Sequence, residues 1–509
     1  MFIFIFFAFQ YIVDFVKVLK FGGSALKNAK DVENLQSIVS GDNCKACVVI
    51  SAFYGITNKL EQLADCILLF QGERKSKKNN KITILERKAL YQKNIEKRKQ
   101  LVDEIIDFHK AIINELSLAD EKNISNVFEL FNDLKETAFN KHFFNKRHFV
   151  DIILSFGERL SSSIVYCFLS KKGVSCYYID ARKIIRTDSH FTNANVDLFK
   201  TENLIKNTFN DIFAKKKVKK VICAGFIGAD CALRTTTIGR NGSDYSASLI
   251  ANALNADVLE IWKDTNGLFT ADPKIVKHVH FIQQISFQEI AEMSSLGNKV
   301  VHIDAIYPCV EKNIPIFLRN VYNQSFQGTK ISKEKYENYI VNGIIKMDDV
   351  SVLKLNIGVR IDMMKTIVKM QKILKFYNDD IITISQNTKQ RLFSAVVSTK
   401  KMPEILGKIK TTFDNDIRKK NLSVNEDDNK SIVSVIGANF STFAGISGKI
   451  FDVLQKNNIN IDAIYDDFST TRISFVCNLK DADKVIKLLH KELVETTAND
   501  DKKVDKKAR

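Results

Sequence analysis

The stretch TTTIGRNGSDYSA, residues 235–247, gathers glycines, hydroxyl side chains, one arginine and one aspartate within thirteen residues. It follows the apolar run VICAGFIG (221–228) and leads into SASLIANALNA (246–256), whose apolar spacing is that of a helix. The order predicts a strand, a glycine-rich turn and a helix start. Free backbone N–H groups and the positive end of the helix dipole converge there, so this turn can hold an anion. By composition alone, a solvated loop fits as well.

Outward from this turn, short apolar runs alternate with helical stretches over roughly the first 330 residues. This rhythm predicts an α/β domain with a largely parallel sheet, whose ligands bind at the carboxyl ends of the strands. The expected strands are VKVLKF (16–21), CVVISAF (47–53), VSCYYI (174–179), KVICAGFIG (220–228), DVLEIW (257–262) and IPIFLRN (314–320).

A second glycine-rich turn follows the first expected strand, in VLKFGGSAL. Lys20 lies near the end of that strand, and Gly22, Gly23 and Ser24 lead into a helical stretch. Backbone N–H groups of such a turn contact a phosphate while a lysine reaches it from the side. The lysine precedes the glycines, so the pattern is not that of a Walker loop. A tight strand-to-helix turn beside an exposed lysine explains the glycine pair equally well.

Other polar groups also fall at expected element ends. VVISAFYGITNKL supplies Ser51 and Thr57, and in ILSFGERLSSSIV we expect Glu158 between a strand and a helix. A carboxylate there either holds a substrate ammonium or complements the helix dipole. EIWKDTNGLFTADPKIV forms a long loop with an aromatic and a cation suited to a nucleotide, and SSLGNKVVH places Lys299 beside a glycine. The mixture of lysines, hydroxyls and glycines is the one that phosphoryl transfer requires.

These motifs together resemble the aspartate kinases, within the amino-acid kinase superfamily. The resemblance is carried by FGGSAL, VVISAFYGITNKL, SFGERLSS, GFIGADCALRTTTIGRNGSDYSA, EIWKDTNGLFTADPKIV, LGNKVVH and GTKI, in that order. It implies an amino-acid kinase domain over 16–331, with an open sheet sandwiched by helices. Two further units, 345–425 and 431–495, resemble the paired α+β ACT (ferredoxin-like) domains of these enzymes.

The resemblance implies transfer of the ATP γ-phosphate to the side-chain carboxylate of L-aspartate, the first step towards lysine, threonine and methionine. It makes Lys20 and Asp244 the catalytic pair. Substrate contacts fall on Ser51, Thr57, Glu158, Arg240 and Ser243. Nucleotide contacts fall on Gly22, Gly23, Ser24, Lys263, Asp264, Phe269, Lys274 and Lys299. Mg²⁺ accompanies the ATP and is bound by phosphate oxygens more than by protein, so no metal ligand is assigned.

The chain departs from the family pattern at several positions. Ser24 and Ala25 stand where Thr-Ser is usual, Asn241 replaces a glycine, and Leu233 falls where that region often has glycine. Asparagine tolerates a left-handed backbone, so we expect the turn at 241 to survive. Three more departures keep bulk and charge on the nucleotide side: Lys263, Phe269 and Lys274.

The C-terminal units are expected to regulate the enzyme. Feedback by lysine or threonine is implied by the family, and which of the two acts is open. A homodimer or higher homo-oligomer is implied as well. A kinase of glutamate or another small acid, and a catalytically inactive ACT-based sensor, are the alternatives. Retained Lys20, Arg240 and Asp244 argue against the sensor.

Composition limits the other function classes. The net charge of +17 would suit a nucleic-acid binder, but the excess is diffuse, and basic residues do not alternate with aromatic ones as base stacking requires. The densest basic run, 74–99, is expected to be an exposed helical insertion. Most of the nine cysteines are isolated, which fits a reducing compartment and a cytoplasmic protein. Cys44 and Cys47 form a CxxC that fits either two core thiols or half of a redox or metal site.

The two ends of the chain lie outside the expected domains. The first 15 residues are strongly apolar but shorter than a membrane-spanning helix. We expect them to be an N-terminal extension or a lead-in strand, and not an anchor. Between the two C-terminal units, residues from about 411 to 430 have the composition of a linker, and 496–509 that of a disordered basic tail.

Overall fold

The computed structural model describes residues 15–41, 43–73, 84–140, 145–216, 218–239, 241–296, 301–334, 340–438, 440, 443–465 and 471–496. The chain divides into two compact units. The first consists of the chain up to Gly267 together with Asp304–Lys333, and the second of Leu268–Ile303 together with the chain from Glu334.

The first unit is built on a largely parallel sheet, as the sequence predicts. Its strands lie in the order β12-β11-β7-β1-β2-β4-β3. All neighbours in this order are parallel except β11 and β12. A short antiparallel hairpin, β5 and β6, follows β4. The strands are β1 (Val16–Phe21), β2 (Lys45–Ile50), β3 (Cys176–Ile179), β4 (Lys220–Ala224), β5 (Ile227–Ala229), β6 (Thr235–Thr237), β7 (Val258–Lys263), β11 (Ile316–Asn320) and β12 (Thr329–Ser332).

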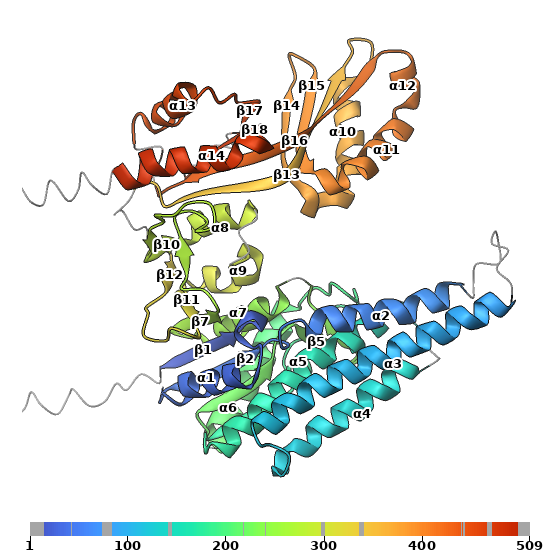
Figure 1. Ribbon diagram of the computed structural model, residues 1–509, viewed down its shortest axis with the longest axis vertical. Helices are drawn as coiled ribbons and strands as arrows, with labels where there is room; N and C mark the ends of the chain where they lie inside the picture. The colour runs from blue at the N-terminus through green and yellow to red at the C-terminus, as the bar shows by residue number, and fades with distance from the viewer. Residues whose placement is uncertain are drawn as a thin grey trace, which may run out of the picture. The chain divides into compact units, whose positions relative to one another are not determined.

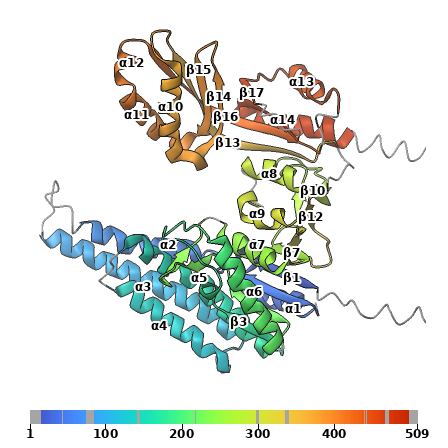
Figure 2. The ribbon, with the colours of Figure 1, turned by 180° about the vertical axis from the view of Figure 1, so that it is seen from behind.

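Helices cover both faces of this sheet. Successive strand residues point to opposite faces, and Leu19 and Phe21 of β1 join a core cluster with five helices, α1 to α5. Of these, α2, α3 and α4 are long and lie side by side (Figures 1 and 2). Lys20 points to the other face, where α7 packs. The helices are α1 (Ala29–Ser40), α2 (Ile56–Glu73), α3 (Ile84–Glu115), α4 (Ser125–Phe139), α5 (Lys146–Lys171), α6 (Leu198–Lys215), α7 (Gly242–Leu254) and α9 (Ile303–Glu311).

The expected strand before Glu158 is wrong. Residues 146–171 form one continuous helix, α5, and Glu158 lies in its interior. The run ILSF is apolar on every side because this helix is buried on most sides, and a short apolar run does not separate a strand from a buried helix. By length and composition α5 could also cross a membrane, but 83% of its most apolar window is buried inside the protein.

The second unit is built on an antiparallel sheet in the order β14-β15-β13-β16-β18-β17. Two core clusters pack helices against it, one with α10 and α11 and one with α13 and α14. The elements are β13 (Gly343–Ile357), α10 (Met363–Leu374), β14 (Ile381–Asn387), β15 (Leu392–Ser398), α11 (Met402–Thr412), α12 (Asp414–Arg418), β16 (Leu422–Ile436), α13 (Ile446–Lys456), β17 (Ala463–Tyr465), β18 (Arg472–Asn478) and α14 (Leu479–His490).

The expected linker at 411–430 is wrong. This segment contains α12 and the first half of β16. Strands β13 and β16 are 15 residues long and pair along both halves of the sheet, with a register shift between Met347 and Val350. Some of the charged residues that suggested a linker lie in α12, and others, such as Glu426 and Asp428, lie at exposed positions of β16. The partner strands of β16 still satisfy its backbone groups.

The segment 268–303, which the sequence analysis includes in the expected kinase domain, packs with the C-terminal sheet. The N–H of Ile344 donates to the carbonyl of Thr270 at 2.7 Å, and the amide of Asn342 donates to Glu289 at 2.6 Å. The elements of this segment are β8 (Leu268–Phe269), β9 (Phe281–Ile282), β10 (Gln284–Ser286) and α8 (Phe287–Ser295). Residues 1–14 and 497–509, which hold the expected extension and nearly all of the tail, lie outside the described residues.

Candidate active site

The polar residues singled out in the first unit come together at one edge of its sheet. In the parallel register, Phe21 of β1 lies beside Ile50 of β2 and Trp262 of β7, and Ile50 lies beside Ala224 of β4. The residues that follow these strand ends therefore meet at the same edge. This is the carboxyl edge, where open α/β sheets bind their ligands.

At this edge a buried lysine and a buried aspartate form an ion pair. Lys20 Nζ lies 2.5 Å from Asp244 Oδ1, and both side chains are almost fully buried. Burial works against the charge on Asp244, but Lys20 and the nearby Lys263 outweigh it and hold its pKa below the usual range. Two lysines thus converge on one carboxylate.

Lys263 ends β7 on the same side of the site. Burial lowers its pKa, and repulsion from Lys20 lowers it further, while Asp244 acts in the opposite direction. A cation held in this way gains most from an anion placed beside it. The departure at this position therefore adds a second cation beside Asp244.

The glycine turn after β1 forms the next wall. The N–H of Gly22 donates to the carbonyl of Trp262, and residues Gly23–Ala25 form one turn of 3-10 helix. A Cβ on Gly23 would lie 3.2 Å from the carbonyl oxygen of Ala52, which is tighter than side chains usually allow. Ser24 and Lys27 bond the carboxylate of Asp264, Lys27 at 3.0 Å. Burial opposes the charge on Asp264, but these two donors keep its pKa below the usual value.

Glu158 reaches this region from the interior of α5. Its side chain is buried, and one carboxylate oxygen, Oε2, has no hydrogen-bond partner. Burial raises its pKa to about 8, although the N–H of Ala52 and the charge of Lys20 act in the opposite direction. Ser51, which follows β2, is buried nearby, and its carbonyl accepts a bond from Ser161 on the same helix as Glu158. An unpaired buried carboxylate is suited to receive a cation.

The turn quoted at the outset folds as expected where the structure describes it. Asn241 has φ +56°, in the left-handed region, so asparagine does replace glycine there without loss of the turn. Leu233 likewise has φ +60°, a conformation that favours glycine. Ser243 is the second residue of α7, and its Cβ would lie only 2.7 Å from a Cβ on Gly225. The glycine therefore lets the helix start approach the end of β4.

Other expected site residues lie outside the described residues or in other elements. Arg240 and Lys299 lie outside the described residues. Phe269 and Lys274 belong to the second unit, where the Phe269 ring packs at 6.0 Å from that of Phe281 and Lys274 is exposed. Thr57 lies in the first turn of α2, which begins at Ile56 after β2, and is half-buried.

No group of three or more His, Cys, Asp or Glu side chains that could hold a metal ion occurs among the described residues. Cys47 is buried in β2, and its burial raises the pKa of the thiol well above the usual value. That environment is typical of a core thiol and not of a reactive one.

Lys27 was missed by the sequence analysis. It bonds Asp264, and its ammonium lies 5.9 Å from the ring of Tyr54 and 5.7 Å from that of Tyr322. Its only sequence signal is a position seven residues after Lys20, because Tyr54 and Tyr322 come from distant parts of the chain.

Several known aspartokinases are similar in sequence to this chain over nearly its whole length. Lysine-sensitive aspartokinase 3 of Escherichia coli is 27% identical over 484 residues, which cover 94% of this chain and 99% of that protein. The bifunctional aspartokinase/homoserine dehydrogenase 2 of Arabidopsis thaliana is 25% identical over 93% of this chain. The chain spans about half the length of that bifunctional protein and of the similar ones it matches.

Solved structures match in the same way. The structure of E. coli aspartokinase III in complex with aspartate and ADP superposes with a TM-score of 0.74 at 25% identity, covering 94% of this chain and 99% of the other. That of Clostridium acetobutylicum aspartate kinase, at 23% identity and a TM-score of 0.70, shows the fold alone. The resemblance and the fold class expected from the sequence are thereby confirmed.

Family comparisons divide the chain into two regions. Residues 433–493 match an ACT domain, at the C-terminal half of the second sheet. Residues 16–320, more than half of the 509, match the amino acid kinase family. The match covers β1, the glycine turn, Glu158 and the Lys20–Asp244 pair. The chain therefore belongs to the amino acid kinase family.

Proposed function

We propose that the protein is an aspartate kinase, which transfers the γ-phosphate of ATP to the side-chain carboxylate of L-aspartate and releases ADP and 4-phospho-L-aspartate. The observation that carries this proposal is the buried Lys20–Asp244 pair beside the glycine turn at the carboxyl edge of the sheet. Similarity to an aspartokinase whose structure holds aspartate and ADP supports the choice of both substrates.

The reaction needs charge neutralisation more than proton transfer. The attacking carboxylate is already ionised at neutral pH. One of its oxygens forms a bond to the γ-phosphorus while the bond to the bridging oxygen of ADP breaks, so no proton moves. Lys20 stabilises the negative charge on the transferring phosphoryl group, and Asp244 holds Lys20 in place. Lys263 supplies a second cation to the phosphates, and the N–H groups of the Gly22–Gly23 turn face them.

Mg²⁺ arrives with ATP as part of the substrate. Asp244 is the carboxylate beside the proposed phosphate position, and it is already engaged by Lys20. This donor set fits a metal held mainly by phosphate oxygens, where it would offset their charge. Asp264 is bonded by Ser24 and Lys27, so we assign it to ordering the glycine turn beside the nucleotide.

The aspartate substrate is proposed to bind between Glu158 and the turn at residue 240. The unpaired oxygen of Glu158 would accept the ammonium, and the bound cation would return this carboxyl group to its charged form. By the resemblance, Arg240 clamps the α-carboxylate through a bidentate contact. Ser51, Thr57 and Ser243 complete the substrate side, and Phe269, Lys274 and Lys299 are proposed for the nucleotide.

Regulation is proposed for the C-terminal part of the chain. The ACT match and the lysine-bound structure of E. coli aspartokinase III support an amino-acid effector, with lysine or threonine as the candidates. We also propose that 345–425 and 431–495 form two ACT domains that pair between copies in a homodimer or larger homo-oligomer, and that the enzyme works in the cytoplasm.

A coupled assay with a trapping step tests the kinase proposal. ADP release is measured with Mg-ATP and each of a panel of amino acids, and hydroxylamine converts any acyl phosphate to a hydroxamate. We expect aspartate-dependent hydroxamate that falls by at least about a thousandfold in Lys20→Met, since charge stabilisation is the main catalytic term.

The matched control for this assay is Lys17→Met, on the same strand but outside the site, which should keep full turnover. Hydroxamate with glutamate in place of aspartate would support the neighbouring acid kinase instead. A folded protein without turnover on any amino acid would overturn the proposal.

A further inference from the structure

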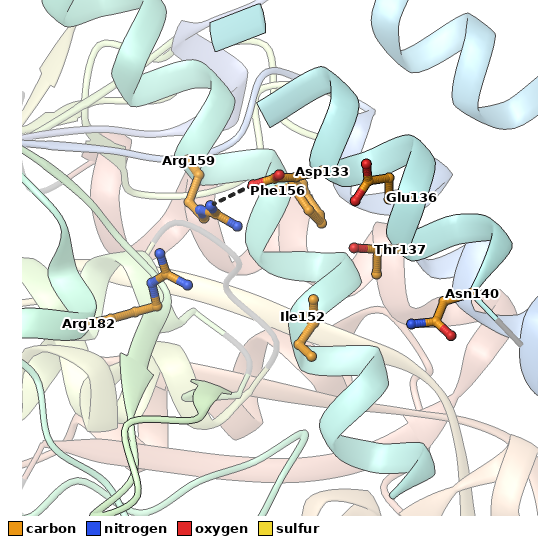
Figure 3. A pocket seen from close by; sticks show the side chains of 8 residues that line it. All are labelled: Asp133, Glu136, Thr137, Asn140, Ile152, Phe156, Arg159 and Arg182. Carbon is orange, nitrogen blue, oxygen red and sulfur yellow. Dashed lines mark ion pairs between the residues drawn. The ribbon is translucent and has the colours of Figure 1, made fainter. Parts of the chain in front are cut away.

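A polar pocket lies in the first unit, outside the candidate active site. Its volume is about 310 Å³, within the range of small-molecule sites. One stripe of α4 and one stripe of α5 line it, each with the spacing of a helix face, together with a residue from the 3-10 turn Ala181–Lys183 (Figure 3). The lining residues are Asp133, Glu136, Thr137, Asn140, Ile152, Phe156, Arg159 and Arg182.

Arg159 is a buried cation whose ion pair in this pocket, with Asp133, is a long one (Figure 3). Only 14% of its side chain is exposed, and the nearest carboxylate oxygen, of Asp133, lies 3.8 Å away. Its guanidinium stacks over the ring of Phe156, at 4.9 Å from the centroid. Burial, and then repulsion from Arg182, lower the pKa of Arg159. An anionic group at hydrogen-bond distance would relieve both effects.

Most of the hydrogen-bond donors of Arg182 are already bound to other side chains of the protein. It bonds Asp180 through two nitrogens, Nε and Nη2, and donates a third bond to Thr235 at 3.0 Å. These bonds leave Arg182 with little capacity to bind a further anion. The anion-binding capacity of this wall therefore rests on Arg159, with the guanidinium edge of Arg182 beside it in Figure 3.

The side of the pocket formed by α4 is acidic. Asp133 and Glu136 lie on α4, and the side chain of Asp133 is 57% exposed. Ile152 and Phe156 add an apolar surface to the lining. Two arginines face three carboxylates, counting Asp180, so a free phosphate, with its double negative charge, suits the pocket poorly. A molecule with one carboxylate, one ammonium and a small apolar body matches the arginine, the carboxylates and the apolar surface of this lining.

We propose that this pocket binds a free α-amino acid, with its carboxylate on Arg159 and its ammonium towards Asp133 and Glu136. The pocket is distinct from the proposed aspartate site, because Glu158 is buried against Ala52 and does not line it, whereas Arg159, the next residue of α5, does. The proposal does not depend on the kinase activity.

Binding to the full chain tests this inference without any measurement of turnover. Isothermal titration calorimetry is run with each of the common amino acids on the wild type, on the double variant Asp133→Asn/Glu136→Gln, and on Glu129→Gln. Glu129 is an exposed carboxylate of α4 that does not line the pocket, so it is the matched control. We expect one or more amino acids to bind the double variant at least about tenfold more weakly, with unchanged affinity for the control.

The same titrations carry a second readout. Propionate, a carboxylate without an ammonium group, should bind at least about tenfold more weakly than alanine or another amino acid that uses the pocket. Thr137→Phe, which fills the cavity without changing charge, should abolish that binding. The inference is overturned if no amino acid loses affinity in the double variant, or if propionate binds as tightly as the amino acid. Amino acids bound at the aspartate site or at the C-terminal domains would bind all these variants equally.

Discussion

Glu158 is buried and has one unpaired carboxylate oxygen. Its protonation should therefore change the free energy of unfolding with pH. Its folded-state pKa, about 8, lies above that of an exposed glutamate. The folded form therefore binds this proton more tightly than the unfolded chain, and the free energy of unfolding falls as pH rises from about 4.5 through about 8. We expect Glu158→Gln, which cannot ionise, to lack this fall and to be more stable than the wild type at pH 8 by about 1–4 kcal/mol. Urea unfolding at pH 5 and pH 8 measures the difference.

The same substitution separates binding from stability. Because the carboxylate is proposed to receive the substrate ammonium, Glu158→Gln should raise the KM for aspartate at least about tenfold while the KM for ATP stays within about twofold. A KM for aspartate like that of the wild type would remove Glu158 from the proposed substrate site, whatever its effect on stability.

At the scale of elements, the approach of α7 to the end of β4 depends on one missing side chain. A Cβ on Gly225 would lie 2.7 Å from the Cβ and 2.9 Å from the Cα of Ser243. The first turn of α7, which carries Asp244, must then move away from Lys20. We expect Gly225→Ala to lower kcat at least about tenfold and to cost about 1–3 kcal/mol of stability. Steady-state kinetics and thermal unfolding measure the two effects.

Gly407→Ala is the matched control for this substitution. Gly407 lies inside α11, and nothing would lie within 4 Å of an added Cβ. Alanine there should leave turnover unchanged and gain about 0.5–1 kcal/mol of stability, since it favours the helix. Wild-type turnover in Gly225→Ala would contradict the role assigned to the position of the helix start.

At the scale of the whole molecule, the last helix is tied to a segment 220 residues earlier. His490, at the end of α14, lies 2.8 Å from the hydroxyl of Thr270 and 3.0 Å from Glu495, with the His280 ring beside it. Burial lowers the pKa of His490, and His280 adds to this, while Glu495 acts against it. The stabilising contribution of neutral His490 is present above about pH 6.5 and is lost as pH falls through the lower folded-state pKa.

We therefore expect the second unit to lose stability between pH 7 and pH 5, and His490→Gln, which cannot titrate in this range, to lose less by about 0.5–2 kcal/mol. Calorimetric unfolding of both proteins at the two pH values measures this difference. An equal loss of stability in both proteins would show that other groups cause the pH dependence. In that case Thr270→Val should also leave the pH dependence of stability unchanged.

The sequence predicted a strand, helix or turn well where the residues that determine it lie close together along the chain. The apolar runs at 16–21, 176–179 and 220–224 became strands because a short run between polar turns has few other solutions in an α/β protein. The left-handed backbone at Asn241 was also predictable, since it follows from the turn chemistry of a few neighbouring residues. The interior of α5 was not predictable in this way, because this helix is buried on most sides and its apolar residues therefore show no clear helical period.

By itself, the sequence determined most strands of the parallel sheet with the turns that follow them, the lysine and aspartate of the candidate site, and the family resemblance. Each of these depends on residues that are close together along the chain. Only the tertiary structure decided which side chains meet. It brought Lys27 to Asp264, left one oxygen of Glu158 unpaired, grouped 268–303 with the C-terminal sheet, and built a pocket from Arg159 and Asp133. Such contacts join residues from distant elements, so they follow from packing and not from local propensity.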